Sequence, residues 1–186
     1  GSRDNTGKII DSMLSEDGRL IVIHQENAGV TAARMAGTKA AKGHYIFYLD
    51  SDDMITDYCI AVLMQHSENG TVDMVSGNFQ IIEKNERVHT IASDSLTVKS
   101  FNGYNCFLEI FRQCDQPLYP RLIKREICLQ TNTPFSIKWA EDAAMLFQII
   151  SLCKRTTYID EIIYFLRCNP ESTTAQACSE AFITQK

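Results

Sequence analysis

The sequence predicts an α/β fold, a mostly parallel sheet covered on both faces by helices. Helix-like and strand-like segments alternate through residues 1–77, a pattern typical of parallel strands joined by crossover helices. The chain has 186 residues, of which 45% are hydrophobic and 22% charged, as expected of a globular domain with a sizeable core. We therefore expect one domain over residues 1–186, in three successive parts: 1–77, 78–168 and 169–186.

The first part alternates helices with strands. Three segments have the apolar spacing or the composition of helices: residues 5–17, 30–43 and 56–67. Three others are short runs rich in β-branched and aromatic residues: residues 19–25, 44–49 and 72–77. Turn residues separate the segments, among them Gly43, which is a favourable stop for a helix. The order helix, strand, helix, strand, helix, strand follows.

The second part is mixed. Residues 78–98 have the pattern of a hairpin with its tip at residues 84–86. Helices are predicted near three segments: residues 99–113, 124–130 and 141–153. The run "TTYIDEIIYFLR" at residues 156–167 predicts a last strand, and the polar residues 169–186 show little periodicity.

Composition narrows the classes of function. The net charge of −5 argues against nucleic acid as the main partner. No apolar run approaches the roughly 20 residues that a membrane-spanning helix needs. The seven cysteines form no C-x-x-C pair, so we interpret them as reduced thiols rather than as a disulfide framework. The expected location is the cytoplasm, including the inner face of the membrane.

Three aspartates follow the predicted strand at 44–49 within four positions: Asp50, Asp52 and Asp53, with Ser51 between the first two. Neighbouring carboxylates repel one another, and removing water from each of them costs free energy. Ligands of α/β sheets bind where strands end at their carboxyl edge, and Asp-x-Asp supplies the oxygen ligands that suit Mg²⁺ or Mn²⁺. We expect Asp50 and Asp52 to hold such an ion with a diphosphate. The alternative is a solvated turn in which Asp53 caps the next helix.

Three stretches carry a resemblance to a known family: "GSRDNTGKIID", "VIHQENAGVTAARMAGTKAAKGHYIFYLDSDD" and "YIDEIIYFLR". They resemble glycosyltransferase family two over residues 1 to about 174, most densely over residues 20–53. The resemblance implies the nucleotide-sugar-binding GT-A fold. It also implies inverting, metal-dependent transfer of a sugar from a nucleotide-diphosphate donor, expected to be a UDP-sugar. The expected acceptor is a glycan or a lipid-linked molecule, with peripheral membrane association.

An alternative function on the same fold is a non-catalytic module that binds nucleotide sugars or glycans. It is left open by Met35, which stands where the family usually has Asn. The resemblance also implies that a first strand–helix–strand unit is missing, since members have an Asp-Asp-Gly-Ser ending of which only Gly1-Ser2 would remain. We expect such a fragment to bind nucleotide weakly, to be inactive, and to form homodimers through an open sheet edge.

Donor-site residues are implied by the same resemblance. Arg34 lies near the start of the helix predicted at 30–43, next to the acidic turn, and is expected, with Ser51, to contact the donor. Arg167 matches the Arg of a family segment that folds over the diphosphate. For Arg34 the alternative is a structural salt bridge with Asp50 or Asp53.

A second acid pair, Glu141 and Asp142, opens the helix predicted at 141–153. An inverting transfer needs a carboxylate that takes the proton of the acceptor hydroxyl. The resemblance assigns this role to Asp142. Glu141 is expected either to orient Asp142 or to contact the acceptor, and Trp139 to offer an apolar face to an acceptor sugar. The alternative is that acids in a first turn only stabilise the helix dipole.

A basic stretch, "PLYPRLIKRE", covers residues 117–126. Its cationic residues Arg121, Lys124 and Arg125 are candidates for phosphate contacts on the acceptor side. Most surface lysines and arginines are only solvated, and we interpret these three in that way.

Overall fold

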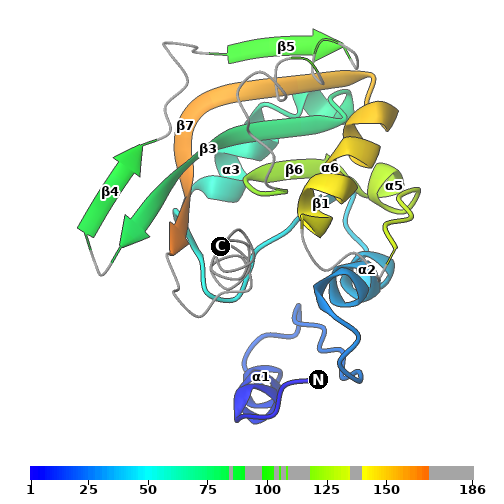
Figure 1. Ribbon diagram of the computed structural model, residues 1–186, viewed down its shortest axis with the longest axis vertical. Coiled ribbons are helices and arrows are strands. Elements are labelled where there is room, and N and C mark those ends of the chain that lie inside the picture. Colours follow the sequence, from blue (N-terminus) through cyan, green and yellow to red (C-terminus); the bar gives the residue numbers. More distant parts are fainter. Residues whose placement is uncertain are drawn as a thin grey trace, which may run out of the picture.

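The computed structural model describes residues 1–83, 86–90, 98–102, 105, 108, 118–134 and 140–167. Its helices are α1 (Thr6–Met13), α2 (Val30–Ala40), α3 (Cys59–Gln65), the 3₁₀ turn η1 (Glu68–Gly70), α5 (Arg125–Cys128) and α6 (Glu141–Leu152). Its strands are β1 (Tyr45–Phe47), β2 (Met54–Ile55), β3 (Met74–Glu83), β4 (Glu86–Thr90), β5 (Val98–Asn102), β6 (Arg121–Lys124) and β7 (Arg155–Arg167). Figure 1 shows the strands gathered in one curved sheet, with α1 and α2 to one side of it.

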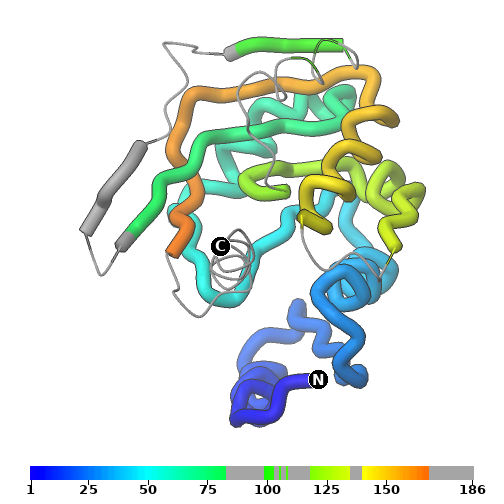
Figure 2. Tube along the Cα trace, in the orientation of Figure 1, coloured from blue at the N-terminus to red at the C-terminus, as the bar shows by residue number. Residues whose placement is uncertain are grey.

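The described strands form one seven-stranded sheet with the order β1-β6-β3-β7-β2, in which β4 pairs with β3 and β5 with β7. Figure 2 shows β3 and β7 running side by side along the curve of the sheet. Among the described pairs, only β3 with β7 is parallel, and the other five are antiparallel. The prediction of a mostly parallel sheet is therefore wrong in this respect. The reason is that β6 lies between β1 and β3 and runs against both, so these two strands are parallel but not adjacent.

Two apolar clusters cover the two faces of the sheet, which confirms the predicted sandwich of helices. On one face, α5 and α6 pack on β1, β3 and β6 through a cluster that includes Ile127, Leu146 and Ile149. On the other face, Cys59 and Leu63 of α3 pack on residues of β3, β6 and β7. Each buried Leu or Ile side chain contributes roughly 1.5–3 kcal/mol relative to its exposed state.

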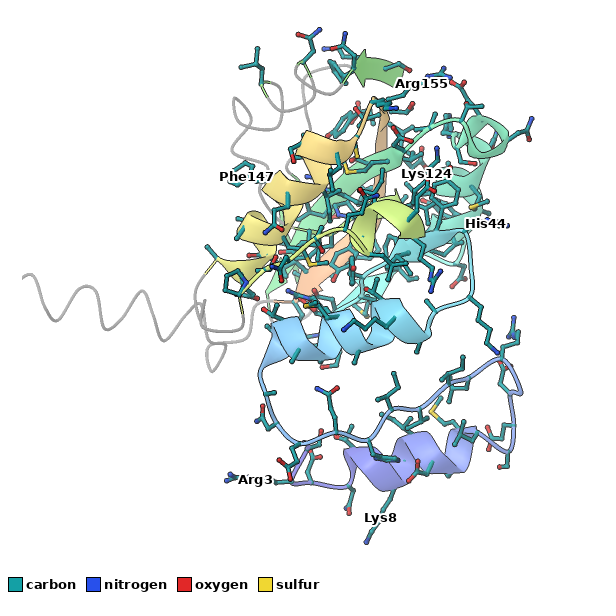
Figure 3. The ribbon with its side chains drawn as sticks, turned by 90° about the vertical axis from the view of Figure 1, so that its right-hand side faces the viewer. Arg3, Lys8, His44, Lys124, Phe147 and Arg155 are labelled. Carbon is teal, nitrogen blue, oxygen red and sulfur yellow. The ribbon has the colours of Figure 1, made fainter. Side chains whose placement is uncertain are left out.

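The N-terminal region stands apart from this core. Helix α1 has no buried residue, and α2 lies between α1 and the sheet (Figure 3). Both confirm predicted helices, although α2 ends at Ala40 and not at Gly43. The predicted strand at 19–25 is wrong: this segment has no strand partner among the described residues, and Leu20, Ile21 and Ile23 are exposed. A strand exists only where a neighbour pairs with it, so β-propensity alone does not make one.

The second part confirms most of its predicted elements. The hairpin is present as β3 and β4, paired from Gln80 and Thr90 to Glu83 and Glu86. The helix predicted near 99–113 is wrong at its start, because residues 98–102 form β5 along the edge of β7. The remaining helices and the last strand agree with α5, α6 and β7. Residues 169–186 lie outside the described part of the chain.

The basic stretch differs from its prediction. Arg121 is fully buried, and its Nη1 donates to Ser76 Oγ at 2.6 Å. Lys124 Nζ lies 2.7 Å from Asp73 Oδ1. These two cations therefore hold β6 to its neighbours and are not merely solvated. Among the described cysteines, Cys59, Cys128 and Cys153 are buried, and Cys59 and Cys128 are free thiols, as predicted for these two.

Candidate active site

An acidic turn, residues 50–53, leaves the sheet shortly after the end of β1. The backbone N–H of Asp53 donates to the carbonyl of Asp50 at 3.1 Å, which closes the turn. The chain then enters β2, whose two residues pair with β7, and Thr56 N–H donates to the carbonyl of Ile163 at 3.0 Å. The turn is thus anchored by the sheet on both sides.

Arg34 of α2 connects this turn to α6. Its Nη2 donates to both carboxylate oxygens of Asp50, at 2.9 Å and 3.2 Å, and its Nη1 donates to Glu141 Oε1 at 3.2 Å. Only 12% of the Arg34 side chain is exposed. A partly buried guanidinium with charge-assisted hydrogen bonds to two carboxylates fixes their relative position. The structural salt bridge with Asp50 that the sequence left open is therefore present.

Asp53 does not cap the next helix. Helix α3 begins at Cys59, with Tyr58 as its N-cap residue, so that alternative is wrong. The carboxylate of Asp53 instead accepts hydrogen bonds from the Tyr164 hydroxyl at 2.6 Å and from the backbone N–H of Arg167 at 3.0 Å. Burial raises the pKa of Asp53 above its ordinary value.

The acid pair begins α6. Glu141 and Asp142 occupy its first turn, after Ala140 in a left-handed conformation with φ 55°. A helix N-terminus favours carboxylates, because the N–H groups of the first turn are free and partly positive. Burial nevertheless raises the pKa of Asp142, and the neighbouring charge of Glu141 acts in the same direction. A carboxylate with a raised pKa is a stronger base when ionised.

A groove of about 620 Å³ runs between α2 and β1 and reaches the acidic turn. Val30, Arg34, Thr38, Tyr48 and Asp50 are among its lining residues. Its volume lies within the range of small-molecule sites, roughly 300–1,000 Å³. Thr38 and Tyr48 form a hydrogen bond at 2.8 Å across it, so the groove has both polar and apolar walls.

The donor set of the turn suits a divalent ion that also binds phosphate. Asp50 and the exposed Asp52 supply oxygen ligands two positions apart, and Asp52 has no hydrogen-bond partner among the described residues. Within the same residues, no three His, Cys, Asp or Glu side chains gather as a closed cage would require. Mg²⁺ is usually held by one or two carboxylates, with waters and substrate phosphates completing the shell. The residues therefore fit such an ion.

The other predicted residues are distributed as follows. Ser51 is exposed and lines the groove. Arg167 ends β7 and lies beside the turn through its backbone bond to Asp53. Trp139 lies outside the described residues. No signal in the sequence marks Tyr164, because a tyrosine within an apolar strand has the pattern of a core residue.

Comparison with known proteins places the chain in a family. The profile described as Glycosyl transferase family 2 matches residues 1–132. The uncharacterized glycosyltransferase EpsJ of Bacillus subtilis is 28% identical over 181 residues, 94% of this chain and 52% of EpsJ. The glycosyltransferase GlyG of Streptococcus pneumoniae is 42% identical over 80 residues, 42% of this chain and 27% of GlyG.

The fold matches a solved structure as well. The crystal structure of S. aureus TarS 1–349 in complex with UDP-GlcNAc superposes with a TM-score of 0.76 and 18% identity, covering 94% of this chain and 49% of that one. The predicted GT-A fold is thereby confirmed. The chain spans about half the length of EpsJ and of this TarS fragment.

Proposed function

Because the chain belongs to glycosyl transferase family 2, we propose that it serves inverting transfer of a sugar from a nucleotide-diphosphate donor to an acceptor hydroxyl. The donor is a UDP-sugar, and the acceptor is a glycan or a lipid-linked molecule. The observation that carries the proposal is the Arg34 bridge, which joins the acidic turn to the helix that bears Asp142. Candidate donor-binding and base residues thus lie around one guanidinium.

Asp50 and Asp52 hold Mg²⁺ or Mn²⁺ in this proposal. The ion, when bound, supplies charge neutralisation to the diphosphate leaving group. Arg34 keeps Asp50 oriented, because its two hydrogen bonds to that carboxylate fix the rotamer. Ser51 and Arg167 border the donor from the turn and from the end of β7.

Asp142 acts as the general base. The acceptor oxygen attacks the anomeric carbon, its proton passes to an Asp142 carboxylate oxygen, and the bond from that carbon to the diphosphate oxygen breaks. The electron pair of the broken bond leaves with the nucleoside diphosphate. Glu141, held by Arg34 at 3.2 Å, orients the first turn of α6, and Trp139 contacts the acceptor sugar. One displacement inverts the anomeric configuration.

Peripheral association with a membrane is part of the proposal only for a lipid-linked acceptor. In the described part of the chain, no helix has the length and apolar character needed to cross a bilayer. A liposome flotation assay with and without lipid-linked acceptor separates this case from a glycan acceptor in solution.

Calorimetric titration of UDP in the presence of Mn²⁺ tests the donor site. Asp52→Asn removes one ligand charge from the turn and should weaken binding at least about tenfold. Asp57→Asn is the matched control, because Asp57 is another exposed carboxylate five positions further along the chain. Equal affinity of both variants and the wild type would contradict the proposed site. Tight binding of UDP without any turnover, measured with the first strand–helix–strand unit present, would favour the non-catalytic module.

A further inference from the structure

Tyr164 is a fully buried residue of β7 whose hydroxyl contacts the acidic turn. It donates to Asp53 Oδ2 at 2.6 Å. It also lies 3.4 Å from the backbone nitrogen of Asp50, which donates to it in a long hydrogen bond. One hydroxyl therefore contacts both the first and the last residue of the turn.

The ring of Tyr164 is itself held in place. It stacks on Tyr119 with centroids 4.5 Å apart and planes 10° from parallel. On another side it meets Phe47 of β1, with centroids 6.3 Å apart. None of the Tyr164 surface is exposed, so its hydroxyl has a defined position relative to the sheet.

Asp53 connects Tyr164 to the rest of the turn by hydrogen bonds. Its second carboxylate oxygen accepts the backbone N–H of Arg167 at 3.0 Å, while its own N–H binds the carbonyl of Asp50 at 3.1 Å. A carboxylate that accepts two such bonds is oriented toward β7. Asp53 thus differs from Asp52, whose side chain is exposed.

We infer that Tyr164, acting through the Asp53 carboxylate and the Asp50 backbone, is a positioning residue that holds the backbone of the acidic turn, and with it the places from which Asp50 and Asp52 reach the cation and diphosphate. The inference rests on the proposed function of the turn as a donor site. Groups that orient metal ligands without touching the metal typically change its affinity 10–100-fold when they are removed.

Tyr164→Phe tests the inference, since it keeps the ring and its stacking and removes only the hydroxyl. Tyr45→Phe is a matched control: Tyr45 of β1 lines the groove, but its hydroxyl, the one group that this substitution removes, donates to the carbonyl of Val72 at 2.7 Å and not to the turn. The first measurement is hydrogen exchange of the peptide spanning residues 50–56 in metal-free protein. We expect faster exchange in Tyr164→Phe and wild-type exchange in Tyr45→Phe.

The second measurement is the affinity for Mn²⁺ in the presence of UDP, followed by the electron paramagnetic resonance of free Mn²⁺. Tyr164→Phe should weaken binding by about tenfold, and Tyr45→Phe should not change it. Asp53→Asn should lower the Mn²⁺ affinity by a similar factor. The double variant Tyr164→Phe/Asp53→Asn should bind Mn²⁺ no more weakly than either single variant, because both substitutions remove the same contact.

The outcomes are distinct. Wild-type Mn²⁺ affinity in Tyr164→Phe would overturn the inference and leave the proposed donor site standing. Loss of binding in Asp53→Asn together with unchanged binding in Tyr164→Phe would make Asp53 a direct ligand, and would overturn it as well. A wild-type chain that bound neither Mn²⁺ nor UDP would overturn the proposed function itself, before any variant is compared.

Discussion

Arg34 Nη2 lies 2.9 Å from Asp50 Oδ1 and 3.2 Å from Asp50 Oδ2, so one nitrogen serves both oxygens of the carboxylate. The other terminal nitrogen of the same guanidinium binds Glu141, which is 107 positions away from Arg34 in the sequence. This single side chain brings α2, the acidic turn and α6 to one point. The geometry of the site therefore depends on Arg34.

Replacement of Arg34 by Ala should destabilise the chain. It leaves Asp50 and Glu141 facing one another without a cation, and hydrogen bonds to charged groups contribute roughly 1.5–3 kcal/mol. We expect the free energy of unfolding to fall by about 2 kcal/mol in urea titrations. The free energy of unfolding of Arg34→Lys should lie between those of the wild type and of Arg34→Ala. An ammonium keeps the positive charge but lacks the planar fork that binds two partners at once.

Arg155→Ala is the control for this prediction. Arg155 Nη2 lies 2.5 Å from Glu68 Oε2, but both side chains are more than 40% exposed. Exposed ion pairs contribute less than about 1 kcal/mol because water screens them. An Arg34→Ala variant that lost no more stability than Arg155→Ala would contradict the importance of the bridge.

Asp73 gives a prediction on pH dependence. Burial raises its pKa, but hydrogen bonds from Lys124 and from the backbone N–H groups of Lys154 and Arg155 outweigh burial and lower the pKa below 3.8. A lowered carboxyl pKa gives stability that is present above the unfolded value and is lost as pH falls through the folded one. Asp73→Asn should therefore cost about 2 kcal/mol at pH 7.

The difference between Asp73→Asn and the wild type should narrow below about pH 4, where the unfolded carboxyl of the wild type becomes protonated. Urea titrations at pH 7, 5 and 3.5 measure it. If the stability difference between Asp73→Asn and the wild type stayed constant over this pH range, the loss would come from packing and not from the charge of Asp73.

The contribution of Asp142 to stability should depend on pH in the opposite direction to that of Asp73. Burial raises its folded pKa above 3.8, so its contribution to stability is present in full below the unfolded value and is lost as pH rises through the folded one. Asp142→Asn removes a poorly solvated charge at neutral pH. We expect the variant to be more stable than the wild type at pH 7, and this advantage to disappear below about pH 3.5, where the carboxyl is protonated in both the folded and the unfolded state; thermal unfolding measures it. If Asp142→Asn were less stable than the wild type at pH 7, the buried charge of Asp142 would not be destabilising.

The same substitution should separate binding from turnover. With Asn at position 142, no carboxylate takes the acceptor proton, and loss of a general base typically costs 10²–10⁴-fold in rate. Affinity for UDP should be unchanged, because Asp142 does not touch the acidic turn in the proposed mechanism. Nucleoside diphosphate release in a coupled assay measures the rate, and unchanged turnover would remove Asp142 from the mechanism.

Local signals predicted the elements that build the site, but not the contacts between them. The strand of β7 and the helix α6 have strong patterns and were predicted almost to the residue. The strand at 19–25 was predicted from composition alone and is absent, because no described strand pairs with it. A run of β-branched residues specifies a strand only together with a partner.

The acidic turn itself was predicted from the sequence, whereas the side-chain contacts that hold it in place were not. Asp53 looked like a helix cap, since it precedes a helical segment, but its partners Tyr164 and Arg167 lie more than 110 positions further along the chain. The Arg34 pair with Glu141 is equally remote. Such contacts depend on how the sheet curves, which no short stretch of sequence encodes.

Anomalous diffraction from a crystal grown with Mn²⁺ and a UDP-sugar tests the central claim most directly. The claim is that the carboxylates of the turn after β1 exist to receive a divalent ion carrying a diphosphate. It predicts one manganese peak within about 2–2.6 Å of Asp50 and Asp52 oxygens, with the diphosphate on its open side. A diphosphate ordered elsewhere in the protein, with no peak at this turn, would contradict it.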